Sequence, residues 1–98
     1  MKIIWSPLAV EQVQDIAAYI ALDKPSVAIE WAEKIFNSVN QLIEFPDSGR
    51  IVPEIKRKEI RELVLKNHRI IYKVKSKEIL ILVVKYYHQI LKKDDVKV

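Results

Sequence analysis

The spacing of apolar residues changes near the middle of the chain, and this change limits the folds that the sequence can adopt. Up to residue 45 the apolar residues recur every three or four positions, whereas from residue 59 most of them alternate with polar residues. The first spacing is typical of amphipathic helices and the second of strands with one buried face. The sequence therefore predicts an α+β fold in which helices come first and a sheet follows.

Two helices are predicted before Pro46. Ser6-Pro7 marks the start of the first, because serine caps a helix and proline at the first helical position forfeits only an N–H that would be unpaired. Asp23-Lys24-Pro25 separates the two helices, and Phe45-Pro46 ends the second. Each helix has one apolar stripe, so we expect an antiparallel hairpin that packs on a sheet. The stripes comprise Ala9, Val13, Ile16, Ala17 and Ile20, then Ala28, Ala32, Ile35, Val39 and Leu42.

Strands are predicted at the start of the chain and throughout its second half. The expected segments are residues 2–5, 59–65, 68–75 and 78–86, with two-residue turns at 66–67 and 76–77. The last three form an antiparallel meander with the helices on one face. Residues 79–84, ILILVV, are apolar on both faces, as in a central strand that is covered on both sides. Asp47-Ser48-Gly49-Arg50 is expected to be a turn.

The turns also predict which residues share a face of the sheet. Two-residue turns place Leu65 opposite His68 and Lys75 opposite Glu78. The predicted helix-side face carries Leu63, Leu65, Ile70, Tyr72, Val74, Ile79, Ile81 and Val83. The other face carries Glu62, Val64, Arg69, Ile71, Lys73, Leu80, Val84 and Tyr86, and reaches His88 if the last strand continues. In this register Arg69 lies opposite Val84, with Tyr86 as its diagonal neighbour.

Ninety-eight residues leave no room for a second core, so residues 1–98 are predicted to form one domain with 87–98 as a short helix or flexible tail. The N-terminal residues lack a signal-peptide pattern, and the longest aliphatic run is six residues, far short of a membrane span. The chain also lacks cysteine, and so has no disulfide framework. We therefore expect a soluble, cytoplasmic protein.

The charges are divided unequally between the two halves of the chain. Residues 1–49 hold three Lys/Arg against seven Asp/Glu, and residues 50–98 hold fourteen against six. This asymmetry indicates a polyanion or an acidic protein as the partner. The alternative is a solvated basic surface that binds no partner.

Several kinds of site are excluded by residue type. Two histidines without cysteine or clustered carboxylates do not make a zinc site, and a single glycine excludes a glycine-rich phosphate loop. We therefore expect no metal and no cofactor. A basic face with arginine, lysine, tyrosine and histidine remains, and this inventory suits binding or cleaving a phosphodiester.

Metal-independent RNA cleavage needs a base, an acid and a cation for the charge that builds on phosphorus. Glu54 and His88 are candidate bases, His88 and Tyr87 are candidate acids, and Arg69 with Arg61 is the candidate clamp. Tyr86 and Tyr87 are also candidates to stack unpaired bases. The predicted target-binding residues are Lys56, Arg57, Lys58, Arg61, Lys73, Lys85 and Tyr86.

Each of these residues also has a structural alternative. A tyrosine at a strand end often packs in a half-buried position. For Arg61 the alternative is an ion pair with a helix carboxylate, and for residues 56–58 it is a solvated loop. His68 is expected to be a hydrogen-bonded structural residue rather than a catalyst.

Four segments carry a resemblance to a known family. They are "IIWSPLAVEQVQDIAAYIA", "FPDSGRIVPE", "IRELVLKNHRIIYKV" and "ILILVVKYYHQIL", and together they span residues 3–91. In this order they resemble the ParE/RelE superfamily of type II toxin–antitoxin toxins, and the ParE-like branch in particular. The resemblance implies a strand, a helix hairpin and a three-stranded meander, the order predicted above.

The resemblance implies two different targets. ParE-like members poison DNA gyrase, whereas RelE-like and YoeB-like members cleave mRNA in the ribosome with glutamate, arginine and histidine or tyrosine. The matching positions here are Glu54, Arg69, Tyr87 and His88. YoeB-like chains end in Tyr-His-Tyr where this one has Tyr86-Tyr87-His88, and ParE-like chains usually carry an arginine where this one has 89–91, Gln-Ile-Leu.

The sequence therefore predicts a growth-inhibiting toxin whose target is either gyrase or ribosome-bound mRNA. The expected partner is a small acidic antitoxin, which folds around the toxin in a hetero-oligomer. A degenerate toxin that retains only antitoxin binding is the remaining alternative.

Overall fold

The structure, a computed structural model, describes residues 1–88. Its elements in chain order are β1 (Lys2–Trp5), α1 (Pro7–Ala21), α2 (Pro25–Asn40), a short 3₁₀ turn η1 (Gln41–Ile43), β2 (Arg50–Ile51), β3 (Ile60–Leu65), β4 (His68–Val74) and β5 (Glu78–Tyr86). The predicted helix hairpin and meander are confirmed. Residues 87 and 88 form a turn, and the rest of the predicted tail, 89–98, lies outside the described residues.

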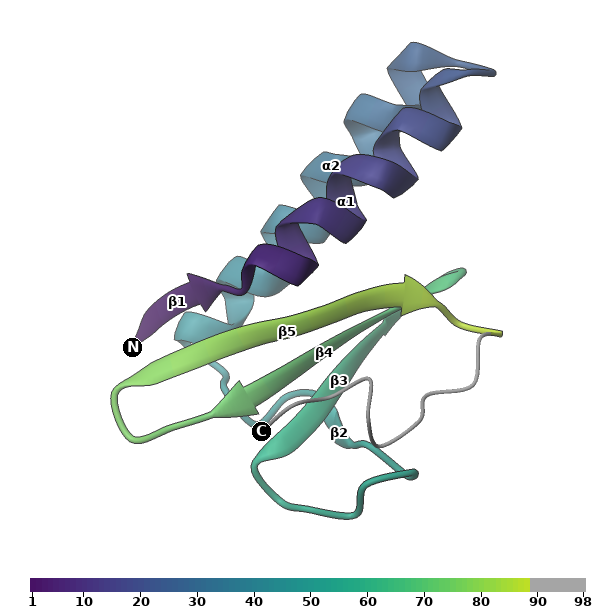
Figure 1. Ribbon diagram of the computed structural model, residues 1–98. Helices are drawn as coiled ribbons and strands as arrows, with labels where there is room; N and C mark the ends of the chain where they lie inside the picture. The colour runs from purple at the N-terminus through teal and green to yellow at the C-terminus, as the bar shows by residue number, and fades with distance from the viewer. Residues whose placement is uncertain (89–98) are drawn as a thin grey trace.

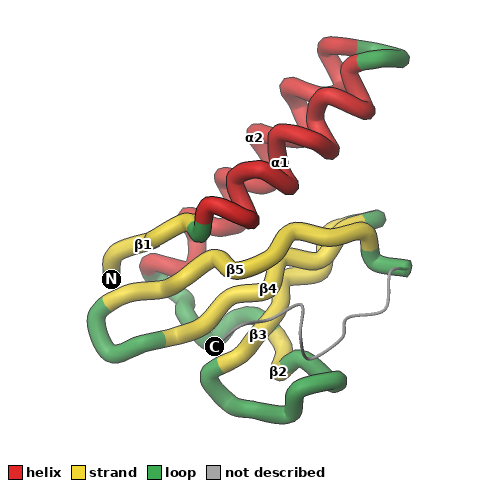
Figure 2. Tube along the Cα trace, viewed as in Figure 1, coloured by secondary structure: helices red, strands yellow, loops and turns green. Residues whose placement is uncertain are grey.

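The five strands form one sheet in the order β1-β5-β4-β3-β2. The strand β1 joins the meander at its outer edge and runs parallel to β5, with Lys2 opposite Glu78. The two-residue strand β2 pairs with β3 at the other edge, and it begins at Arg50, the last residue of the predicted turn. Figures 1 and 2 show the helix hairpin on one side of the sheet, with its tip projecting away from the strands.

Each face of the sheet has its own apolar core, so the expectation that the chain has no room for a second core is wrong. On the helix side, residues from α1, α2 and η1 pack against Ile70, Tyr72, Ile79, Ile81 and Val84. On the other side, Val52 and Ile55 from the segment after β2 pack against Ile60, Ile71 and Val83. The strand β5 is therefore covered on both faces, as its sequence predicted.

The register of the meander follows the prediction only in part. Leu65 lies opposite His68 as predicted, and Val74 lies opposite Ile79. Further along β5 the pairing shifts by one residue, because Tyr72 pairs with Ile81 whereas Ile71 pairs with Val83. Leu82 is the extra residue of this bulge.

Because of the bulge, the side chains at the end of β5 lie on the opposite faces of the sheet from those predicted. Arg69 lies opposite Lys85, so the predicted pairing with Val84 is wrong. Val84 and Tyr86 pack on the helix side, whereas Val83 belongs to the second core. The prediction that Tyr86 shares a face with Arg69 is therefore wrong as well.

Side chains at the start of α1 satisfy the backbone groups around the bulge. The Ser6 hydroxyl accepts a hydrogen bond from the Ala9 N–H, as the predicted N-cap, and donates one to the Leu82 carbonyl at 3.0 Å. The Gln12 side-chain oxygen accepts from the Val84 N–H at 2.7 Å. These contacts explain why β5 keeps an irregular register, since buried backbone groups need partners.

The loop before β2 is fixed by a buried tyrosine. The Tyr72 hydroxyl accepts from the Gly49 N–H and donates to the Pro46 carbonyl, both at 2.9 Å. Burial raises the pKa of this phenol. A Cβ atom on Gly49 would lie 2.5 Å from the Tyr72 hydroxyl oxygen and 2.6 Å from the Glu62 carbonyl oxygen. Only glycine fits this close approach.

Among the helices of residues 1–88, none is long and apolar enough to cross a membrane.

Candidate functional site

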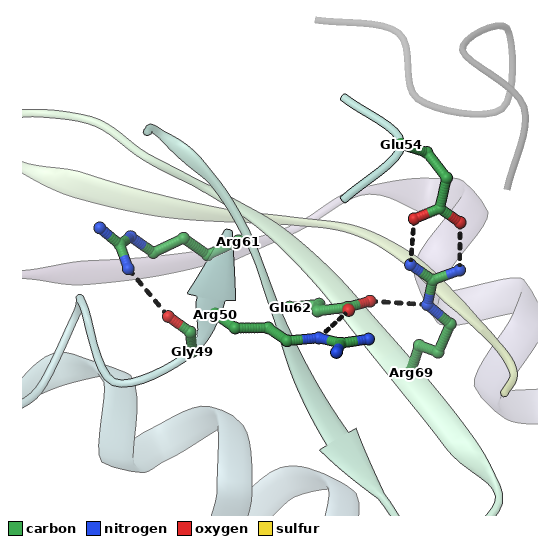
Figure 3. Close-up of polar contacts among 6 residues, drawn as sticks. All are labelled: Gly49, Arg50, Glu54, Arg61, Glu62 and Arg69. Atoms are coloured by element: carbon green, nitrogen blue, oxygen red, sulfur yellow. Dashed lines mark hydrogen bonds and ion pairs between the residues drawn. The ribbon is translucent and has the colours of Figure 1, made fainter. Parts of the chain in front are cut away.

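Four charged side chains form a chain of ion pairs on the sheet face away from the helices (Figure 3). Two Arg69 nitrogens donate to the two Glu54 oxygens at 2.8 and 2.9 Å. The Arg69 Nε donates to one oxygen of Glu62 at 2.6 Å, and Arg50 Nε donates to the other. The order Glu54–Arg69–Glu62–Arg50 alternates in sign.

The middle of this chain is buried. The side chains of Arg69 and Glu62 are 5% and 0% exposed, those of Glu54 and Arg50 30% and 53%. Hydrogen bonding to Glu54 raises the pKa of Arg69, and hydrogen bonding to Glu62 raises the pKa of Arg50. Because an unpaired buried charge is strongly destabilising, each of the two inner groups depends on its neighbours.

Strand pairing and one tight turn bring the four residues together. Arg50 lies opposite Glu62 across β2 and β3, and Glu62 is the diagonal neighbour of Arg69 across β3 and β4. Glu54 comes from the segment between β2 and β3, where the N–H groups of Ile55 and Lys56 both donate to the Val52 carbonyl. The turn ends at Lys56, which has a positive φ of 58°.

The predicted catalytic residues are only partly gathered by this arrangement. Glu54 and Arg69 are in direct contact, and Tyr87 lies close enough to Arg50 to contribute to its raised pKa. The exposed ring of His88 lies edge-on to Tyr87 at 5.8 Å between centroids. The Tyr86 ring instead stacks on His68 at 4.7 Å, on the helix side of the sheet.

The sequence alone did not identify two of the four ion-paired residues, Glu62 and Arg50. The sequence predicts Glu62 on the same face as Arg69, and a diagonal pair of opposite charges on adjacent strands is the signal that identifies Glu62. Arg50 was assigned to a turn, and the two-residue strand β2 that aligns it with Glu62 has no pattern that a sequence could reveal.

The other predicted target-binding residues lie in several places. Arg61 does not pair with a helix carboxylate; it donates to the carbonyls of Lys58, Asp47 and Gly49 and lies 3.5 Å from the Asp47 carboxylate in the loop before β2. Arg57 pairs with Glu59 at the surface, and Lys56 and Lys58 are exposed. Lys73 and Lys85 are half-buried on β4 and β5.

An apolar groove lies on the helix side, away from the ion pairs. It has a volume of about 970 Å³ and runs between the helix hairpin and the end of the sheet where β3 turns into β4. Tyr19, Leu22, Trp31, Leu65, His68 and Tyr86 line it, with Asp23, Glu30, Lys34 and Lys66 as its charged residues.

His68 has the structural role that its sequence position predicted. It is 6% exposed, and its Nδ1 accepts a hydrogen bond from the Trp31 indole at 3.3 Å. Burial lowers the pKa of the imidazole, and a neutral ring with Nδ1 as acceptor carries its proton on Nε2.

The chemistry open to the site follows from these contacts. The candidate base Glu54 and the candidate clamp Arg69 are paired with each other, and the Glu54 side chain is 30% exposed whereas that of Arg69 is 5% exposed. Within residues 1–88 no group of three or more histidine, cysteine or carboxylate side chains is placed to hold a metal ion.

Comparisons with known proteins agree on one family. The profile described as ParE toxin of type II toxin-antitoxin system, parDE, matches residues 3–90. A solved structure described as a chromosomal ParDE TA system from P. aeruginosa superimposes with a TM-score of 0.72 at 26% identity, covering 88% of this chain and 95% of that one. A curated relative from Sinorhizobium fredii (strain NBRC 101917 / NGR234), named "Putative toxin Y4kP", is 38% identical over 64 residues, which is 65% of this chain.

The profile covers nearly the whole chain, and the structural match has the same fold. The match to the Sinorhizobium relative spans 64% of that protein's length. The chain belongs to the ParE family, the toxins of ParDE-type type II toxin–antitoxin systems.

Proposed function

We propose that this toxin acts by binding DNA gyrase and trapping it on DNA, rather than by cleaving ribosome-bound mRNA. The observation that carries this proposal is the Glu54–Arg69–Glu62 ion-pair chain. A ribonuclease of the predicted type needs a carboxylate free to take a proton and a guanidinium free to hold a phosphate. Here these two groups are bound to each other.

The geometry of the pair supports a structural role. Arg69 donates two hydrogen bonds to Glu54 and a third to Glu62. The planar guanidinium therefore donates to carboxylates of the same protein. Freeing Arg69 for a phosphate would leave the buried Glu62 carboxylate with Arg50 alone. Membership of the ParE family supports the same target, since gyrase is the target that the resemblance implies for ParE-like members.

The partner that neutralises the toxin is proposed to be a small antitoxin with an amphipathic segment. The structure offers a suitable surface, because the groove between the hairpin and the sheet exposes apolar side chains that a monomer leaves in water. Tyr19 and Leu22 at its rim are 70% and 84% exposed. Co-expression with the small protein encoded beside this gene should restore growth and yield a complex of the two chains.

A gyrase cleavage assay tests the target. Purified toxin, gyrase and supercoiled plasmid are expected to yield linear DNA after detergent treatment. The Glu54→Gln variant should trap gyrase within about threefold of the unmodified chain, because Glu54 is not a catalyst in this proposal. Glu59→Gln is the matched control, since it makes the same change in the same segment at an exposed ion pair. Circular dichroism confirms that each variant is folded.

A translation reaction read by primer extension tests the competing function. Intact message at inhibitory toxin concentrations is the expected result. Cuts within codons that disappear in Glu54→Gln but persist in Glu59→Gln would overturn the proposal and establish the ribonuclease. A chain that inhibits neither gyrase nor translation, yet binds its antitoxin, would be the degenerate toxin.

A further inference from the structure

We propose that one end of the sheet, formed by Lys2, Arg57, Lys58, Lys73, Lys75 and Lys77, binds the phosphate backbone of duplex DNA directly. We call these six residues the basic end. The inference rests on the proposed function and adds to it, because it gives the toxin a contact with the DNA that gyrase holds. It concerns the end of the sheet away from the apolar groove.

Backbone contacts gather the six residues from four separate segments. Lys2 lies beside Glu78 in the β1–β5 pairing, and its N–H donates to the Lys77 carbonyl. The Lys75 N–H donates to the Glu78 carbonyl across the β4–β5 turn. The Val74 N–H donates to the carbonyl of Glu59, the residue that follows Lys58.

Strand alternation places the strand members of the basic end on the sheet face away from the helices. Ile3 and Trp5 of β1 and Tyr72 and Val74 of β4 pack in the helix-side core. Lys2 and Lys73 alternate with them and so point to the opposite face. A ligand on this face does not meet the helix hairpin, which lies on the other side of the sheet (Figure 1).

The charges at this end are not balanced within the described part of the chain. The six cations face two carboxylates, Glu59 and Glu78, which form surface ion pairs with Arg57 and Lys75. Among residues 1–88, Lys2, Lys58 and Lys77 form no ion pair. The helix hairpin has the opposite balance, because residues 7–40 hold two lysines and five carboxylates.

The shape of the basic end suits a nucleic acid better than an acidic peptide. Lys2 and Lys73 lie in β1 and β4, and the other four cations lie in the segments that lead into β3 and β5. These are four adjacent strands of the sheet, which span about 14 Å at the usual strand spacing. Duplex DNA carries a phosphate about every 3.4 Å along each strand, so such a row covers about four phosphates. An acidic peptide that folds on binding also needs apolar surface, and in residues 1–88 the groove that offers it lies at the other end of the sheet.

Fluorescence anisotropy with a labelled 20-base-pair duplex and the full chain tests the inference without gyrase. Neutralising about four phosphates gives a binding constant that falls about a hundredfold between 50 and 200 mM salt. Lys73→Gln/Lys75→Gln should bind more weakly at 50 mM and lose only about tenfold over the same range, because two contacts are gone. The matched control is Lys24→Gln/Lys34→Gln, which removes two charges from the hairpin and should bind as the unmodified chain does.

Three outcomes would overturn the inference. The first is no binding of the duplex by the unmodified chain at 50 mM salt, and the second is equal binding by the two double variants. The third is binding of single-stranded RNA, or of an acidic peptide of equal charge, that is at least tenfold tighter than binding of the duplex. Circular dichroism checks that both variants fold. A gyrase cleavage assay on the same samples separates the two proposals, since linear plasmid without free-duplex binding would leave the gyrase proposal standing and remove this one.

Discussion

At the scale of single residues, burial decides what a charged side chain is available to do. Arg69 has the residue type and the sheet face expected of a phosphate clamp, yet its guanidinium is bound to Glu54 and Glu62 and is almost fully buried. Arg50 at the outer end of the same chain keeps half of its side chain in solvent. A sequence shows the charge of both residues but not the segment that covers one of them.

We expect the free energy of unfolding to depend on pH because of His68. Burial lowers the pKa of its imidazole in the folded chain, whereas the unfolded chain takes up a proton near pH 6.5. Above that pH neither state is protonated and His68 contributes nothing to the pH dependence. As the pH falls below about 6.5 only the unfolded chain gains the proton, so the free energy of unfolding falls by at most about 1.4 kcal/mol per pH unit until the folded pKa is reached.

Urea unfolding at pH 7.5, 6.5 and 5.5 measures this effect. The unmodified chain should lose stability over the range, and His68→Phe should lose less of it. His88→Gln, a change at an exposed turn residue, is the control and should behave as the unmodified chain does. Equal slopes for all three proteins would show that the His68 imidazole titrates alike in the folded and unfolded states.

At the scale of elements, the bulge in β5 determines which tyrosine belongs to the core. Tyr86 packs on His68 and the helix-side core, whereas Tyr87 is 42% exposed. Tyr86→Ala should therefore lower the free energy of unfolding by about 2 kcal/mol, less than the 3–5 kcal/mol typical of fully buried aromatic residues. Tyr87→Ala should cost less than about 1 kcal/mol. Urea denaturation of both variants compares them directly, and a larger loss for Tyr87→Ala would contradict the bulged register.

The elements themselves could be predicted because their signals are local. Ser6-Pro7 marked the first helix, and the alternation from residue 59 marked three strands. The bulge at Leu82 has no local signal, since ILILVV is apolar on both faces in either register. It depends on Ser6 and Gln12, which lie more than seventy residues earlier and hold the Leu82 and Val84 backbone groups. Without the bulge, the sequence predicts the wrong face of the sheet for Tyr86, and the predicted candidate site is wrong at this residue.

At the scale of the whole molecule, the helix hairpin extends beyond the sheet that supports it. The buried residues of α1 are Ala9, Val13 and Ile16, and towards its C-terminal end Tyr19 is mostly exposed. Few buried apolar contacts imply a low free energy of local opening. Amide hydrogen exchange should therefore be at least tenfold faster for residues 19–27 than for β4 and β5.

The same amide hydrogen exchange, measured on the toxin–antitoxin complex, tests where the antitoxin binds. If the antitoxin occupies the groove, exchange of residues 19–27 should slow in the complex, while β4 and β5 stay protected in both states. Uniformly slow exchange along the hairpin of the free toxin would show that its tip is as stable as the sheet.

The parallel pairing of β1 with β5 has a consequence for how the toxin is made. Trp5 lies opposite Ile81, so β1 cannot complete its pairing with β5 until 76 further residues have been added to the nascent chain. At translation rates of 5–20 residues per second, this takes about 4 to 15 seconds. The sheet can therefore be completed only after β5 has left the ribosome, so an antitoxin present at that moment would meet the toxin as it finishes folding.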